Sequence, residues 1–220
     1  MNAFPSNTIN NENYYGNIRN EIFPLLPERV TRILEIGCGT GNTLKHIKIE
    51  KRCEWTGGVE LFSAAAQEAR SKIDVVYEGN IELMELPVPL DSLDVILCLD
   101  VLEHLVDPWN LIMRLHHLLK QGGVLIASIP NVRYYQISLS LLCLGQWNYT
   151  SEGCLDKTHL RFFTLATALQ LIESSGLKID KVQATGLEQG RWAHLVNKLS
   201  FSFFKQLLEY QYLLRARRVD

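Results

Sequence analysis

Three glycines spaced by two residues, at the end of an apolar run, constrain this chain more than any other feature. Residues 33–36 are aliphatic apart from Glu35, which predicts a buried parallel strand that ends at a tight turn. The turn residues are Gly37, Gly39 and Gly41. Glycine accepts positive φ angles and lets a ligand lie against bare backbone. Residues 42–47 can begin a helix whose N-terminus would face that ligand, so the pattern predicts a nucleotide-type cofactor.

The glycine spacing separates two kinds of cofactor. A dinucleotide-binding loop reads G-x-G-x-x-G, and its third glycine lets helix and strand pack closely. That pattern needs glycine at position 42, where this chain has Asn42. The observed order, with Glu35 before the first glycine, is E-x-G-x-G-x-G. It resembles motif I of the class I S-adenosylmethionine (SAM)-dependent methyltransferases. SAM carries no phosphate, so its loop needs room for an amino-acid moiety and a sulfonium.

Composition places limits on the kind of protein. A chain of 220 residues forms one large domain, or one domain with a small appendage. Its net charge of −2 gives no broad basic surface, so no nucleic-acid partner is expected. Five cysteines without a C-x-x-C pair indicate free thiols in a reducing compartment. Residues 1–20 lack the apolar segment of a secretory signal, and no stretch is long enough for a transmembrane segment. We therefore expect a cytoplasmic location.

Strand and helix patterns alternate along the chain, which predicts βαβ units and a parallel sheet. With the resemblance, this implies an α/β fold: a doubly wound, Rossmann-like, mostly parallel seven-stranded sheet with helices on both faces and an antiparallel last strand. The expected strands are 33–36, 55–59, 74–77, 93–99, 124–129, 177–182 and 192–197, and the last of these is patterned weakly enough to be a loop instead.

Three helices are expected in the second half of the chain, and one of them covers residues 167–175 and ends at Gly176. Asp107 and Pro108 predict a helix start, and leucines at 3.6-residue spacing extend it to Leu119, with Gly122 and Gly123 ending it. The tail from residue 200 to 218 combines phenylalanines and leucines with basic residues, which predicts an amphipathic helix. Such a helix would pack on the domain or on a second subunit, or contact a membrane surface.

The chain is expected to divide into three parts. Residues 1–29 form a segment that covers the cofactor, residues 30–199 form the methyltransferase domain, and residues 200–220 form the tail. Within the domain, residues 131–164 break the strand–helix rhythm. We expect them to form an insertion on the acceptor side of the site. The oligomeric state is left open, with a dimer as one option.

Two further positions are candidates for cofactor binding. Glu60 ends the second strand, where a carboxylate can accept hydrogen bonds from both ribose hydroxyls. After the third strand come Gly79, Asn80 and Ile81. The Asn80 amide can hydrogen-bond an adenine edge while Ile81 lies on the ring face, although Gly-Asn is ordinary turn chemistry too.

The resemblance extends over residues 30–130. Residues 99–108 resemble the "D-V-L-E-H-L-x-D-P" stretch of the superfamily, and residues 118–125 resemble "L-L-K-P-G-G-x-L", with Gln121 in place of proline. Asn13-Tyr14-Tyr15 resembles the aromatic entry segment. The expected SAM contacts are Tyr15, Glu35, Gly37, Gly39, Gly41, Glu60, Leu61, Gly79, Asn80, Ile81, Leu99, Asp100 and Val101.

A second resemblance concerns residues 145–164. They are similar to a branch of the superfamily with the pattern "G-x-W-x-Y…G-x-L-D-x-T-H-L-R-F-F-T". This branch often accompanies genes for cell-surface sugars or secondary metabolites, which implies a small-molecule or glycan-like acceptor. An oxygen acceptor must lose its proton, and histidine has a suitable pKa. His159 is the first candidate base and His104 the second, and no metal is expected.

Two other functions compete with methyl transfer. An NAD(P)-dependent oxidoreductase has a similar fold, but Asn42 and the lack of a Tyr-x-x-x-Lys pair argue against it. A non-catalytic SAM-binding or scaffold protein would keep the glycine loop without turnover, since the loop reports binding rather than catalysis.

Overall fold

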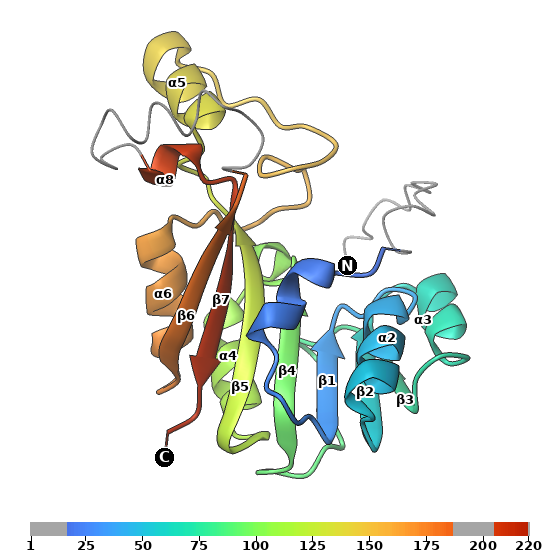
Figure 1. The fold of residues 1–220 in the computed structure, drawn as a ribbon. Helices are drawn as coiled ribbons and strands as arrows, with labels where there is room; N and C mark the ends of the chain where they lie inside the picture. The colour runs from blue at the N-terminus through green and yellow to red at the C-terminus, as the bar shows by residue number, and fades with distance from the viewer. Residues whose placement is uncertain (1–16, 187–204, 220) are drawn as a thin grey trace.

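The computed structural model describes residues 17–186 and 205–219 and shows one seven-stranded sheet (Figure 1). The strand order is β3-β2-β1-β4-β5-β7-β6, and every neighbouring pair is parallel except the two that involve β7. The strands are β1 (Arg32–Ile36), β2 (Trp55–Glu60), β3 (Val75–Glu78), β4 (Leu93–Leu99), β5 (Leu119–Pro130), β6 (Lys178–Thr185) and β7 (Gln211–Arg217). The predicted mostly parallel sheet with an antiparallel last strand is confirmed.

Helices cover both faces of the sheet (Figure 1). They are α2 (Asn42–Lys51), α3 (Ser63–Ala69), α4 (Pro108–His116), α5 (Tyr135–Leu144), α6 (Leu165–Glu173) and α8 (Lys205–Leu208), with short 3-10 helices η1 (Asn20–Leu25) and η2 (Leu102–His104). One core cluster joins the sheet to α4 and α6, and another joins it to η1, α2 and α3. Alternate residues of β4 enter the two clusters, with Ile96 in the first and Leu97 in the second. A strand buried on both faces explains the continuous apolar run.

The order of the strands reverses between β1 and β4. The chain leaves β1 toward β2 and β3 on one side and continues from β4 toward β5 on the other. In open α/β sheets, ligands bind beyond the carboxyl ends of the strands at such a switch point. The loop after β1 and Asp100 after β4 both lie there, because β1 and β4 pair in parallel with Ile36 beside Cys98.

The prediction of a C-terminal amphipathic helix is wrong for residues 211–217, which form β7 between β5 and β6. Leu213 and Leu214 point to opposite faces of the sheet and are buried in different clusters. An apolar run between two strands gains more from filling both faces than from one helical stripe. These leucines are therefore not available to a membrane. The expected strand at residues 192–197 lies outside the described residues.

The helix expected to reach Leu119 ends earlier, since α4 stops at His116. The glycine pair lies inside β5, where the pairing with β4 shifts between Leu93 and Val95. Gly122 has a φ of +78°, and a Cβ on Gly123 would lie 2.9 Å from the carbonyl oxygen of Leu93. The glycines therefore make an irregularity in a strand rather than a helix end. The start at Asp107 is confirmed, because its side chain accepts from the N–H of Asn110.

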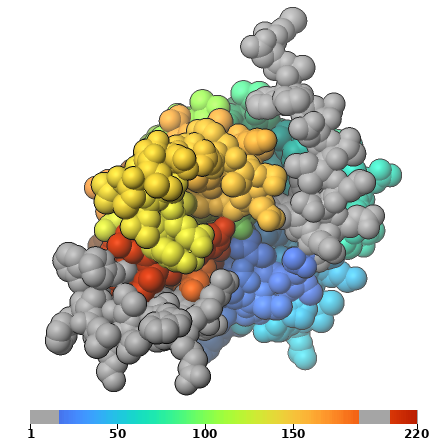
Figure 2. Space-filling model, turned by 90° about the horizontal axis from the view of Figure 1, so that it is seen from above, coloured from blue at the N-terminus to red at the C-terminus, as the bar shows by residue number. Residues whose placement is uncertain are grey.

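Residues 131–163 leave the end of β5 and return to it. The two ends of this segment meet in an isolated parallel bridge between Asn131 and Phe163, and the N–H of Val132 donates to the carbonyl of Phe163. Seen from above the carboxyl ends of the strands, the segment makes a raised mass, yellow to orange, beside the blue N-terminal part (Figure 2). It contains α5, in which no residue is buried.

Among the described residues, no helix has the length and apolar character needed to cross a membrane.

Candidate functional site

The glycine loop after β1 has left-handed backbone at all three glycines. Gly37, Gly39 and Gly41 have φ angles of +70°, +53° and +76°, which disfavour any residue with a Cβ. The N–H groups of Gly37 and Cys38 both donate to the carbonyl of Val59, at 2.8 and 3.0 Å. A Cβ on Gly37 would lie 2.6 Å from Cγ2 of Val101. The loop is thus held against the ends of β2 and β4.

Glu60 is the residue that fastens this loop to β2. Its Oε2 accepts from the N–H of Gly39 at 2.8 Å, and its Oε1 accepts from the N–H of Phe62 at 2.9 Å. The side chain is 4% exposed. Each carboxylate oxygen has a second lone pair, so both hydrogen bonds are compatible with further donors such as ribose hydroxyls. The structural part of this role was not expected from the sequence.

Glu35 lies in β1, one residue before its end, and is buried. The pKa of its carboxyl is raised to about 8, chiefly by burial; Arg19 opposes this shift and the nearby Glu60 adds to it. Its Oε2 has no hydrogen-bond partner among the described residues. A cation bound at the loop would stabilise the charged form of this carboxylate.

The end of β3 joins the same edge. The N–H of Gly79 donates to the carbonyl of Glu60 at 2.9 Å. The Asn80 side chain accepts from the N–H of Glu82 at 2.8 Å and so makes a local turn, while Ile81 is buried in the core. Leu61 is 58% exposed beside this edge. Tyr15 lies outside the described residues.

The carboxylate of Asp100 collects several donors at the end of β4, where Leu99 is buried. Arg19 Nη1 donates to its Oδ2 at 2.6 Å, while Ser128 Oγ, at 2.7 Å, and the Gln211 amide both donate to Oδ1. Arg19 precedes η1, and its N–H donates to Oγ1 of Thr43 at the start of α2. Arg19 was missed because its partner lies 81 residues away in the sequence.

The two candidate histidines are brought together from distant segments. His104 ends η2, and His159 comes from the segment after β5; their ring centroids are 4.7 Å apart, edge to face. The N–H groups of Leu160 and Arg161 donate to the carbonyl of Glu103, at 2.8 and 2.9 Å, which ties the two segments. Burial and the adjacent His159 lower the pKa of His104.

A cavity of about 320 Å³ is lined by residues of the turn after β3 and of α4. Its lining includes Asn80 but not the glycine loop. Its two longest polar side chains already have partners, since Glu82 accepts from the N–H groups of Val106 and Asp107, and Arg114 donates to the carbonyl of Ile81. This cavity is therefore separate from the glycine loop, where we expect the cofactor.

The donor set around the glycine loop fits SAM. Backbone without Cβ atoms admits close approach, the Glu60 carboxylate suits ribose hydroxyls, and the Asp100 carboxylate offers negative charge to a sulfonium. No phosphate-binding feature is needed. The predicted contacts Gly37, Gly39, Glu60, Gly79 and Val101 lie within a connected group.

Comparison with known proteins agrees with this fold and loop. A family model described as a methyltransferase domain matches residues 9–182. A probable S-adenosylmethionine-dependent methyltransferase of Mycolicibacterium smegmatis is 27% identical over 172 residues, which are 77% of this chain and 61% of the relative. A tRNA N(3)-cytidine methyltransferase of Mus musculus is 32% identical over 167 residues, which are 69% of this chain and 41% of the relative.

The solved structure of a SAM-dependent methyltransferase from Mesorhizobium loti has a TM-score of 0.63 and 21% identity, covering 90% of this chain and 96% of that one. This likeness concerns the fold. The chain spans 61% and 41% of the length of the two sequence relatives. Because the family model matches most of the residues that carry the glycine loop and the sheet, the chain belongs to the class I SAM-dependent methyltransferases.

Proposed function

We propose that this chain transfers the methyl group of SAM to an oxygen atom of a small-molecule or glycan-like acceptor. The observation that supports it is the position of the two histidines. His104 ends the 3-10 helix that comes shortly after Asp100 at the switch point, and His159 from the segment after β5 packs against its ring. SAM supplies an activated methyl group, so the protein must chiefly align the acceptor and exclude water.

His159 is the residue proposed to act on the acceptor proton. Its Nδ1 lies 3.0 Å from the carbonyl oxygen of Cys154. A carbonyl only accepts, so Nδ1 carries the hydrogen and Nε2 keeps a lone pair. His104 is the second candidate. Its lowered pKa keeps the ring neutral at pH 7, which is the form able to take a proton.

SAM is proposed to bind the connected group of residues around the glycine loop. Glu60 would accept from the ribose hydroxyls while it holds Gly39. Arg19 would pair with the carboxylate of the methionine moiety, since its guanidinium lies beside Asp100 and its backbone contacts the start of α2. Residues 1–29 would cover the cofactor, and residues 131–164 would line the acceptor side.

An RNA acceptor is a second candidate because one relative is named as a tRNA methyltransferase. The net charge of −2 favours the small acceptor, since RNA binding gains most of its affinity from basic surfaces. An oxidoreductase or a non-catalytic SAM-binding protein is the remaining alternative.

The test combines binding with turnover. Isothermal titration should show binding of SAM and of its demethylated product but not of NAD or NADP. A screen with labelled SAM over sugars, lipid-linked sugars, phenols and tRNA should then label a hydroxyl compound. If the protein binds NAD but not SAM, the proposed cofactor is wrong. If tRNA is the only compound that becomes labelled, the proposed small-molecule acceptor is wrong. SAM binding without labelling of any acceptor would favour the non-catalytic alternative.

With the true acceptor in hand, His159→Ala should lower kcat at least tenfold and leave the Kd for SAM unchanged. His46→Ala, an exposed histidine on α2, is the control and should leave both values unchanged. An unchanged kcat in His159→Ala would remove this residue from the mechanism.

A further inference from the structure

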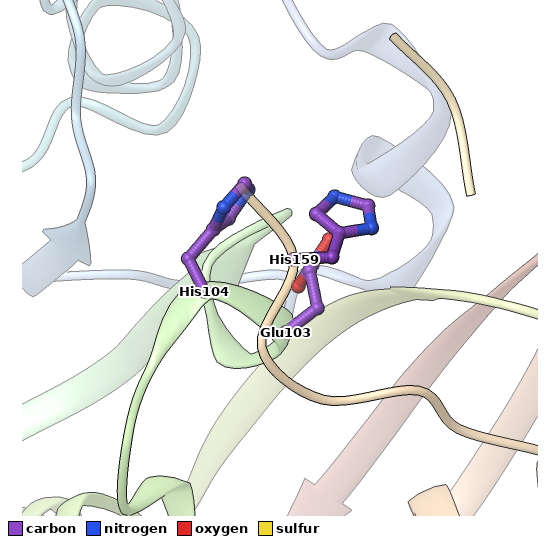
Figure 3. Close-up of side chains that lie close together, drawn as sticks. All are labelled: Glu103, His104 and His159. Atoms are coloured by element: carbon purple, nitrogen blue, oxygen red, sulfur yellow. The ribbon is translucent and has the colours of Figure 1, made fainter. Parts of the chain in front are cut away.

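Glu103 is a buried acid without a partner. It is 1% exposed, and neither of its carboxylate oxygens has a hydrogen bond among the described residues. Removing a carboxylate from water without a compensating partner is costly, and such groups are usually paired or bound to a metal. In Figure 3 the Glu103 carboxylate points toward the ring of His159.

Glu103, His104 and His159 form a compact cluster. Each offers one ligand atom, and these atoms lie within 4.8 Å of one another. Glu103 and His104 come from η2, whereas His159 is held beside them by the backbone bonds from Leu160 and Arg161 to Glu103. The cluster is therefore built by the rigid edge of the sheet and the returning segment together.

In both histidines the ring nitrogen Nδ1 is hydrogen-bonded within the protein, which leaves Nε2 to bind a cation. His159 Nδ1 faces the carbonyl of Cys154 at 3.0 Å. His104 Nδ1 lies 3.1 Å from Oγ1 of Thr158 and 3.3 Å from its carbonyl oxygen. The Thr158 hydroxyl donates to Asp156 at 2.6 Å, so towards His104 it accepts. Both Nδ1 atoms therefore carry hydrogen, and both Nε2 atoms keep a lone pair.

We propose that Glu103, His104 and His159 bind a divalent transition-metal cation of the zinc type. Two imidazole nitrogens and one carboxylate match the three protein ligands of an open zinc site, whose fourth position takes water or substrate. Mg²⁺ and Ca²⁺ prefer an all-oxygen set, so they fit this cluster poorly. The bonds from Nδ1 to Thr158 and Cys154 are the outer contacts that hold metal-binding histidines in place.

The separation of the ligand atoms determines how far they must move to bind one metal ion. With metal–ligand bonds of about 2.0–2.1 Å, tetrahedral ligands lie roughly 3.4 Å apart. The cluster must therefore close by up to about 1.4 Å, and rotation of the partly exposed His104 side chain can supply this movement.

This proposal deepens the proposed function and rests on it for its catalytic meaning. An Nε2 that binds a cation cannot also take a proton, so a metal would replace the direct base. A cation at this place would lower the pKa of an acceptor hydroxyl in its open position. The metal site itself is testable without SAM or acceptor.

The experiment uses the full chain with Cys143→Ser as background, because Cys143 is an exposed free thiol. After treatment with EDTA and its removal, titration with Zn²⁺ should give one ion per chain. Co²⁺ should give the visible absorption of a four- or five-coordinate site. Glu103→Gln, His104→Ala and His159→Ala should each raise the Kd for Zn²⁺ at least tenfold and remove the Co²⁺ band.

His46→Ala is the matched control, since its imidazole is exposed on α2, and it should bind Zn²⁺ as the background does. Melting curves without metal show whether each variant is folded. If Glu103→Gln does not fold, the Zn²⁺ and Co²⁺ measurements on His104→Ala decide the question, because His104 is partly exposed. Absent Co²⁺ absorption, or a Kd unchanged in a folded cluster variant, would overturn the proposal. SAM binding is measured separately on the metal-free background protein, and its absence there would overturn the proposed function rather than the metal site.

Discussion

The N–H of Gly39 donates a hydrogen bond to Oε2 of Glu60 across 2.8 Å, and this contact joins the loop after β1 to the end of β2. Glu60 also accepts from the N–H of Phe62. One carboxylate therefore positions the loop and is also the group that we propose to bind the ribose, so a substitution of Glu60 should disturb both.

Glu60→Gln should raise the Kd for SAM about tenfold, because a neutral amide offers one acceptor oxygen to two backbone donors. Glu50→Gln on the exposed face of α2 is the same substitution away from the site and should change nothing. Isothermal titration of both variants checks this. Equal affinities for the two variants would contradict a role of Glu60 at the cofactor.

Gly39→Val should abolish SAM binding while the chain stays folded, because a branched side chain would occupy the space over the loop. The positive φ of Gly39 adds strain of about 1–2 kcal/mol. Gly122→Val carries a similar strain at +78°, with no atom within 4 Å of its Cβ, at the far end of the sheet. Titration and melting curves should show normal SAM binding in Gly122→Val alone.

Arg19→Gln should weaken SAM binding at least tenfold, because it removes the cation proposed to meet the methionine carboxylate. It should also free Asp100 from its ion pair. Arg19→Lys should restore part of the affinity. Arg29→Gln, an exposed arginine of the same N-terminal part, serves as control. If Arg19→Gln binds SAM as tightly as Arg29→Gln, the proposed carboxylate contact is excluded.

Glu35→Gln should stabilise the protein more as the pH rises. The folded-state pKa of Glu35 is raised from about 4.5 to about 8, so the folded protein holds this proton more tightly than the unfolded chain. Stability is therefore lost between these pH values, on the order of 4 kcal/mol at pH 8. The melting temperatures of the two proteins should agree near pH 4.5 and diverge at pH 8, with Glu35→Gln the higher. A constant difference across the range would contradict the buried charge.

Leu214→Ala should lower the free energy of unfolding by about 2–5 kcal/mol, because Leu214 is 0% exposed in the core beside β5. Leu142→Ala on α5, where the side chain is 83% exposed, should cost little. Urea unfolding of both variants measures the contrast. Equal stabilities would mean that β7 is peripheral, as a tail helix would have been.

The sequence predicted the glycine loop well because its signal is local. Three glycines at fixed spacing need positive φ angles, and all three have them. Strands β1, β4 and β5 were predicted because each is a largely apolar run buried on both faces. The run of β7 has the same character, but its basic residues suggested an amphipathic helix. Arg215 lies buried near Asp180, a partner on β6 that the sequence pattern does not reveal.

The candidate site also has one part that local sequence signals predict and one part that they do not. The sequence by itself determined the donor side, because the loop and the acidic strand ends follow one another in order along the chain. Tertiary structure decided which side chains meet beyond it: Arg19 with Asp100, Gln211 with Asp100, and Glu103 and His104 with His159. These contacts join segments that are distant in the chain, so their pairing depends on the order of the strands and the return of residues 131–163 to β5. No spacing rule along one chain encodes that geometry.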